Sequence, residues 1–167
     1  GLGDVYKRQS YSIVFLPTLV DPTMDFAGMT LCNTRLLYPP EMIDPMLTTT
    51  NHLAWSLATQ WSGVNITPLE INHIWCCLGM AGYMVLQLMK KLFGTNEFRY
   101  RLKMNAEKIV DQDWEKPPIG STFKNSSRPI SCTSKDLDFI KLKATMVLFI
   151  LDRRMIKPER SFGMSRF

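Results

Sequence analysis

The sequence predicts an α+β fold that is mainly helical, with a short pair of strands at its N-terminal side. Two observations carry this expectation. Two short apolar or alternating stretches in the first quarter of the chain each stop at a proline, and four longer stretches place apolar residues at helical spacing. The composition, 46% hydrophobic and 21% charged, is typical of a globular chain.

The first nine residues, 1–9, read as the in-frame translation of a sequencing adapter, so we exclude them from fold reasoning. No Met begins the chain, and the last residues do not resemble a natural terminus. We therefore expect residues 10–167 to be a partial domain, truncated at both ends.

The strand pair is expected at Ile13–Leu16 and at Met29–Tyr38, each followed by proline. Proline cannot donate a hydrogen bond to a sheet ladder, so it ends a strand. The stretch Leu19–Asp25 contains Pro22 and two aspartates, and we expect a turn or loop there.

Four helices follow, and their ends carry capping residues. Thr48–Asn51 offers side chains that cap a helix start, and Leu53, Leu57 and Trp61 then recur on one face. Glycine follows the first two helices, and basic residues close the second and the fourth. The predicted helices are 51–61, 69–93, 96–111 and 134–154. The proline-containing stretch 112–133 is expected to be a loop.

Two features of the sequence argue against a membrane protein and for a reducing compartment. The longest apolar run, Ile74–Met89, has sixteen residues, whereas a membrane span needs ~20, so we expect a buried helix and no membrane partner. The four cysteines form no C-x-x-C pair, which favours buried thiols in a reducing compartment. The net charge is +5, of which residues 1–9 supply +1 (Lys7 and Arg8 against Asp4), and the remaining +4 permits an acidic partner without requiring one.

The sequence lacks the common motifs of metal-binding and catalytic sites. His52 and His73 stand 21 positions apart, and neither has another ligand at metal-site spacing. Outside the adapter-derived residues there is no glycine-rich phosphate loop, and the G-x-S-x-G motif is absent. The sequence therefore predicts no cofactor, no metal and no small-molecule substrate.

The stretch Ala54–Met84 nevertheless resembles the zinc aminopeptidases. That family has H-E-L-A-H-Q-W on its zinc-binding helix, and a glutamate ligand in N-E-G-F-A further along. An ungapped placement matches Leu57, Ala58, Gln60, Trp61, Thr67, Pro68, Trp75, Gly79, Ala81 and Tyr83. The resemblance implies a fragment of a thermolysin-like domain of the zinc aminopeptidase type.

Every position that carries the chemistry of this family differs here. The three zinc-ligand positions hold Trp55, Thr59 and Leu78, and the position of the catalytic glutamate holds Ser56. A catalytic zinc needs three protein ligands and an open position for water, and Trp and Leu cannot coordinate a metal. The substitutions predict a pseudo-aminopeptidase that is not an enzyme.

Two neighbouring motifs agree with this loss. The substrate-binding G-A-M-E-N loop of the family is replaced by D-P-T-M-D at Asp21–Asp25. The last helix aligns Lys143–Leu148 with the family's K-G-A-x-V-L, and Lys141 stands where the family has its transition-state tyrosine.

Longer stretches resemble a non-peptidase family, the subunit 2 proteins of the general transcription factor TFIID in their fungal form. They include F-A-G-M-T-L-C-N-T-R-L-L-Y-P-P-E-M-I, L-A-T-Q-W-S-G-V-N-I-T-P-L-E and S-K-D-L-D-F-I-K-L-K-A. The resemblance covers Tyr11–Phe167. It implies a nuclear TBP-associated factor that supports TFIID assembly and core promoter binding in RNA polymerase II initiation. Its implied partners are other TFIID subunits and core promoter DNA; a divergent zinc aminopeptidase is the alternative.

Basic residues suggest one candidate contact surface. The densest basic cluster comprises Arg153, Arg154, Lys157 and Arg160. It fits a contact with DNA or protein, and an ordinary solvated surface is the alternative. The stretch Arg99–Lys103 alternates charged and apolar residues and fits a solvated helix face.

Overall fold

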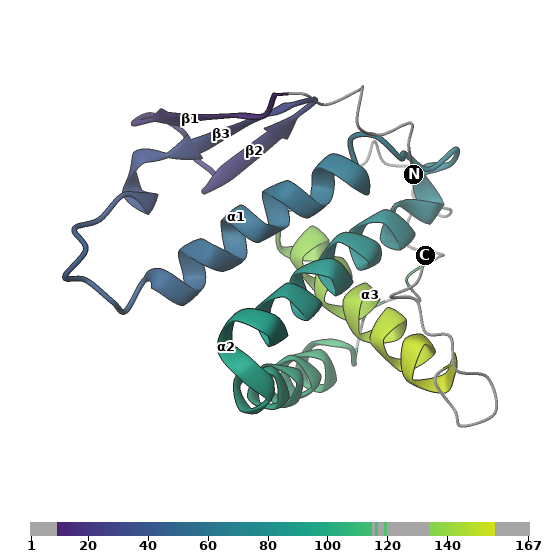
Figure 1. Cartoon of the computed structure of the whole chain (residues 1–167). Coiled ribbons are helices and arrows are strands. Elements are labelled where there is room, and N and C mark those ends of the chain that lie inside the picture. Colours follow the sequence, from purple (N-terminus) through teal and green to yellow (C-terminus); the bar gives the residue numbers. More distant parts are fainter. Residues whose placement is uncertain (1–9, 115, 117–118, 120–133, 156–167) are drawn as a thin grey trace. The chain divides into compact units, whose positions relative to one another are not determined.

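The computed structural model describes residues 10–114, 116, 119 and 134–155 (Figure 1). The adapter-like residues 1–9 and most of the predicted loop 112–133 lie outside these residues. The chain divides into two units at Ile66 and Thr67, and each is described by itself. The predicted α+β class, mainly helical, is confirmed.

The first unit contains a sheet of three strands instead of the predicted pair. The strands are β1 (Ser12–Leu16), β2 (Thr23–Phe26) and β3 (Met29–Asn33), in the order β1-β3-β2. The central strand β3 runs parallel to β1 and antiparallel to β2. Gly28, with a φ of 75°, lies in the tight turn between β2 and β3, where the left-handed backbone favours glycine.

Two features of this sheet differ from the prediction. The second predicted strand ends at Asn33, because the Asn33 side chain accepts a hydrogen bond of 2.8 Å from the Arg35 N–H and caps a short 3-10 helix, η1 (Thr34–Leu36). Strand β2 lies in the predicted loop. Pro22 precedes it, and the Pro22 carbonyl accepts a hydrogen bond of 3.0 Å from the Asn33 N–H.

Helix α1 (Met46–Trp61) starts five residues before the prediction. Its N-cap is Pro45, which makes no side-chain cap, and the predicted cap residues Thr48–Asn51 lie inside the helix. Most of its contacts with the sheet are made with β2. The buried residues are Ala54, Ser56, Ala58, Thr59 and Gln60.

The apolar spacing of α1 therefore did not identify the face that covers the sheet. Leu57 and Trp61 are 45% and 48% exposed. Thr59 and Gln60 are buried instead, because the sheet presents polar partners on the side that α1 covers.

The second unit is helical. After η2 (Ile71–His73) come α2 (Ile74–Gln112) and α3 (Ser134–Met155). Gly94, with φ 85° and ψ 178°, breaks α2 into two segments. The two predicted helices around Gly94 and the predicted last helix are thus confirmed, except that the first of them begins at Ile74 and not at residue 69.

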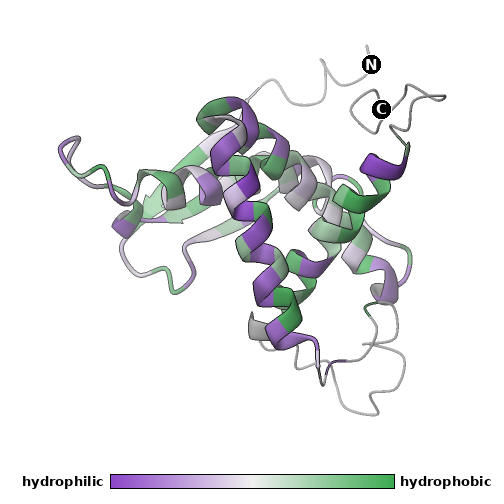
Figure 2. Cartoon of the chain, turned by 90° about the horizontal axis from the view of Figure 1, so that it is seen from below, coloured by the Kyte–Doolittle hydropathy of each residue, from purple (hydrophilic) through white to green (hydrophobic). Residues whose placement is uncertain are grey.

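The contact between α2 and α3 depends on small residues. A Cβ added to Gly82 would lie 1.9 Å from Thr145 Oγ1, and one added to Gly79 would lie 3.0 Å from Leu148 Cδ1. Ala144 is fully buried at the same contact. Figure 2 shows hydrophobic and hydrophilic residues interleaved along the helices, as expected where one face of each helix is packed. Within the described residues, none of the helices combines the length and apolarity that a membrane crossing requires.

Candidate functional site

Thr59, which occupies the second zinc-ligand position of the resemblance, is a buried structural residue. Its side chain is on α1, and the residue is 8% exposed. Its Oγ1 lies 2.9 Å from Asp25 Oδ2 on β2 and 2.9 Å from the Ser56 carbonyl oxygen. A threonine has one hydroxyl proton, so these two acceptors share it. The hydroxyl thus links α1 to the sheet.

The carboxylate of Asp25 is the centre of a small polar network. Its Oδ1 accepts a hydrogen bond of 2.8 Å from Thr30 Oγ1 on β3, while Oδ2 faces Thr59. The Tyr11 hydroxyl lies 2.5 Å from Thr30 Oγ1. Asp25 is the last residue of the D-P-T-M-D stretch, so the segment placed on the substrate-binding loop now joins β2, β3 and α1.

The environment of this network favours the neutral form of Tyr11. Burial raises the pKa of the Tyr11 phenol, and the negative charge of Asp25 raises it further, while the hydrogen bond with Thr30 opposes the shift. Burial and the charge of Asp25 also raise the pKa of the Cys32 thiol. The protonated phenol can therefore take part in the hydrogen-bonded chain at neutral pH.

Gln60 forms a second link, which the sequence analysis did not identify. Its Oε1 accepts a hydrogen bond of 3.0 Å from the Gly28 N–H, and its Nε2 donates one of 3.0 Å to the Phe26 carbonyl. The residue is 2% exposed. Gln60 follows Ser56 by four positions, so the two polar residues share one face of the helix, and this spacing could have indicated a polar packed face. The prediction followed the apolar residues Leu57 and Trp61 instead and placed the packed face on their side of the helix.

Ser56, at the position of the catalytic glutamate, is 1% exposed. Its Oγ is buried and has no hydrogen-bond partner among the described residues. A serine hydroxyl is not a base at neutral pH, so it cannot replace the glutamate. The neighbouring Trp55 is partly buried. In the part of the chain that the structure describes, no group of three or more His, Cys, Asp or Glu residues could hold a metal.

The remaining positions of the resemblance lie in the second unit. Leu78 is partly buried on α2. On α3, Lys141 Nζ lies 3.3 Å from Asp138 Oδ1, and the Lys141 carbonyl accepts a hydrogen bond of 2.7 Å from Thr145. Because three zinc ligands converge on one ion, the resemblance predicts that Leu78 approaches Trp55 and Thr59. This approach involves both units and stays a prediction.

Half of the predicted basic cluster is described. Arg153 and Arg154 are exposed near the end of α3, and the Arg153 guanidinium lies 5.3 Å from the centroid of the Phe149 ring. Lys157 and Arg160 lie outside the described residues.

The other basic stretch carries ion pairs along its helix. Arg101 Nε lies 2.7 Å from Glu97 Oε1, and Lys103 Nζ lies 3.8 Å from Glu107 Oε1. These i,i+4 pairs agree with a solvated helix face.

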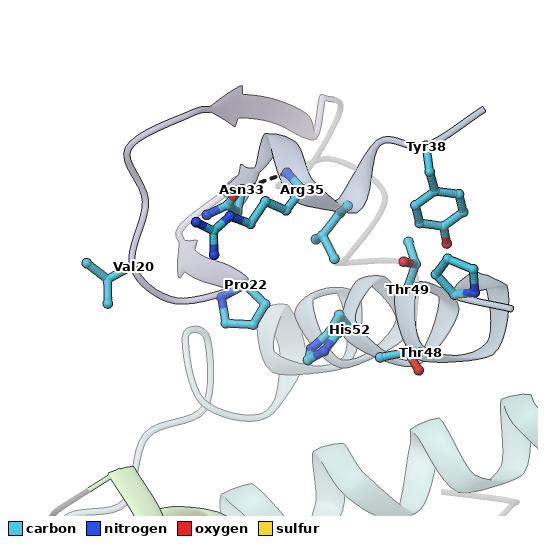
Figure 3. A pocket seen from close by; sticks show the side chains of 10 residues that line it. Val20, Pro22, Asn33, Arg35, Tyr38, Thr48, Thr49 and His52 are labelled. Atoms are coloured by element: carbon cyan, nitrogen blue, oxygen red, sulfur yellow. Dashed lines mark hydrogen bonds between the residues drawn. The ribbon is translucent and has the colours of Figure 1, made fainter. Parts of the chain in front are cut away.

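A separate pocket of about 280 Å³ lies in the first unit, beside the N-terminal part of α1 (Figure 3). It is lined from the strand side and from α1. The lining residues are Val20, Pro22, Asn33, Arg35, Leu36, Tyr38, Pro45, Thr48, Thr49 and His52. None of the positions aligned with zinc ligands lines it, whereas Pro22 belongs to the Asp21–Asp25 stretch aligned with the substrate-binding loop.

Comparison with known proteins identifies relatives over nearly the whole chain. "Transcription initiation factor TFIID subunit 2" of Saccharomyces cerevisiae is 66% identical over 161 residues, which are 96% of this chain. The chain is homologous to one segment of TFIID subunit 2. The proteins of the same name from Schizosaccharomyces pombe and Danio rerio are 34% identical over 96% of the chain and 31% identical over 65% of it. No family model matches the chain.

The matched segment is a small part of these relatives. The chain covers 11% of the S. cerevisiae protein, 13% of the S. pombe protein and 9% of the D. rerio protein. The resemblance to the TFIID subunit 2 family is confirmed, and the names describe these relatives as subunits of a transcription initiation factor. They give no support to the alternative of a divergent zinc aminopeptidase.

Proposed function

We propose that this chain is a non-catalytic structural part of a TFIID subunit 2, which acts in the nucleus in TFIID assembly and core promoter binding. The observation that carries the non-catalytic role is the hydrogen bond between Thr59 and Asp25. It joins two positions that the resemblance places in a peptidase active site, and in this chain both serve to hold α1 on the sheet.

The chemistry of the replaced positions supports this proposal. Catalytic zinc is held by imidazole, thiolate or carboxylate groups, and its charge lowers the pKa of the bound water. Trp55 and Leu78 offer no such donor, and the Thr59 hydroxyl is already bound to Asp25. The sheet and α1 are thus a scaffold from a thermolysin-like domain, a pseudo-aminopeptidase.

The proposed partners are other TFIID subunits and core promoter DNA. For DNA, the candidate surface is the basic cluster Arg153, Arg154, Lys157 and Arg160. Arg153 and Arg154 are exposed, as a phosphate contact requires. Such a contact weakens with added salt, because neutralised phosphates release counterions.

The assembly role can be tested in cells with the tagged full-length protein. Deletion of the segment corresponding to residues 10–167 should remove other TFIID subunits from the purified material. Asp25→Ala combined with Thr59→Val should reduce their recovery, because α1 loses its link to the sheet, whereas the matched change Ser56→Ala should not. Full recovery of TFIID without the segment would contradict the proposal.

The non-catalytic role can be tested by restoring the family's residues. The full-length protein with Trp55→His, Ser56→Glu, Thr59→His and Leu78→Glu should show no aminopeptidase activity, because the Asp21–Asp25 stretch and Lys141 remain. Cleavage of an aminoacyl reporter substrate by this variant would mean that the substrate pocket survives, against the proposal.

A further inference from the structure

The pocket beside α1 combines apolar walls with a few polar groups, as ligand-binding pockets do. Its walls are mainly apolar, and Pro22, Leu36 and Pro45 contribute to them. A few polar groups interrupt these walls, as is usual where a protein binds a ligand with defined orientation. Figure 3 shows Arg35 extending from the strand side toward Pro22, while His52 and Thr49 lie on α1.

Arg35 is the one arginine or lysine among the ten residues that line this pocket, and Asp21 and Asp44 are sequence neighbours of lining residues. None of the ten lining residues is acidic. Arg35 is exposed, and its guanidinium forms no ion pair with a carboxylate among the described residues. The start of α1 lies at the same pocket, has no acidic residue in its first turn and receives no side-chain cap from Pro45.

We propose that this pocket docks an acidic and apolar peptide segment of another protein. A Glu or Asp carboxylate of that segment pairs with Arg35, and a neighbouring apolar side chain packs against Pro22 and Leu36. The hydroxyls of Tyr38, Thr48 and Thr49 supply hydrogen bonds to the peptide. None of Trp55, Ser56, Thr59 and Leu78 lines this surface.

The same features disfavour nucleic acid as the occupant. A DNA backbone is contacted by several cations spread along the phosphates. This pocket has a single arginine, and most of its wall is apolar. A peptide uses both properties at once, because it presents a carboxylate and an apolar side chain at adjacent positions.

Fluorescence anisotropy with defined peptides tests the proposal on the full-length protein. The probe is fluorescein-labelled acetyl-Ser-Leu-Glu-Leu-Ser-amide, and the reference peptide has Gln in place of Glu. The Glu peptide should bind saturably at about 0.15 M salt, and at least about tenfold more tightly than the Gln peptide. Arg35→Gln should weaken its binding about tenfold, whereas Arg99→Gln, which removes an exposed charge elsewhere, should not.

A second variant keeps the proposal testable if Arg35→Gln fails to fold, which circular dichroism would reveal. Thr49→Phe fills the pocket from α1 and should abolish binding of the Glu peptide. The proposal is wrong if neither peptide binds, if both bind equally, or if Arg99→Gln weakens binding as much as Arg35→Gln. Displacement of the Glu peptide by duplex DNA or by inorganic phosphate alone, at low millimolar concentration, would also overturn it.

Discussion

The two units of this chain differ in what allows their helices to pack closely. In the first unit, α1 is tied to the sheet by buried polar side chains, since Thr59 donates to Asp25 and Gln60 bonds to the backbone of Gly28 and Phe26. In the second unit, α2 and α3 approach closely because Gly79 and Gly82 have no side chains at the contact.

The two kinds of packing are sensitive to different substitutions. A polar link fails when one partner is removed, because the other partner is left buried without a hydrogen bond. A small-residue contact fails when volume is added, because the neighbouring helix has no room to move. The first unit should therefore be broken by deleting atoms and the second by adding them.

The largest expected effect comes from adding volume to the second unit. Gly82→Val should destabilise the α2–α3 contact by about 3 kcal/mol, since even its Cβ would lie 1.9 Å from Thr145 Oγ1. Hydrogen exchange measured by mass spectrometry on the full-length protein should show faster exchange in α3. Thr145→Ala removes that hydroxyl, so the double variant should recover part of the loss. A double variant no more stable than Gly82→Val would show that Thr145 is not the limiting neighbour.

The second unit also contains polar links, the ion pair between Lys143 and Asp113 and the hydrogen bond of Tyr83, and Tyr83 tests how much such a link contributes there. Its phenol is buried and hydrogen-bonds with Asp152, and burial, followed by this bond and the Asp152 charge, raises its pKa to about 12. The folded pKa lies above the ordinary value of 10.0, so this group stabilises the fold below pH 10 and loses that contribution between pH 10 and 12. The free energy of unfolding should fall by about 2–3 kcal/mol as Tyr83 loses its proton.

The titration of Tyr83 can be read directly. Absorbance at the phenolate band should be recorded against pH for the wild type and for Tyr83→Phe, and the difference assigns the signal to this residue. A difference curve with its midpoint near the ordinary tyrosine value would mean that Tyr83 is solvated and that the second unit has no buried polar link there.

The smallest effects are expected in the first unit, where two neighbouring residues should respond differently. Thr59→Val keeps the volume but leaves Asp25 Oδ2 without its donor, at an expected cost of about 1–2 kcal/mol. Ser56→Ala removes a buried hydroxyl that has no partner in the described residues, so it should be neutral or slightly stabilising. Hydrogen exchange in α1 measures both, and equal costs would show that Thr59 contributes volume rather than a hydrogen bond.

The sequence predicted the second unit better than the first. Gly94 and the basic helix ends are local signals, and they located the helix break and the end of α3 correctly. Strand β2 could not be predicted, because Pro22 and two aspartates indicate a loop unless their tertiary partners are known. Asp25 is acceptable in a strand here because Thr30 and Thr59 bind its carboxylate.

The residues aligned with the peptidase positions could be named from the sequence, but their structural contacts could not be predicted. The residues at Trp55, Ser56, Thr59 and Leu78 could be named from the resemblance, and their inability to hold zinc follows from their chemistry. That Thr59 would bond to Asp25 could not be predicted, since the two residues are 34 positions apart and the link depends on how α1 crosses the sheet. Gln60 was missed for the same reason.

The central claim is that positions placed on a peptidase site now serve structure and not metal chemistry. Its most direct test is the zinc content of the purified full-length protein, measured by inductively coupled plasma mass spectrometry for the wild type and for Thr59→Val. We predict far less than one zinc per chain attributable to this segment, so the two proteins should give the same value. A stoichiometric zinc that chelators remove from the wild type, and that is missing from Thr59→Val, would contradict the claim.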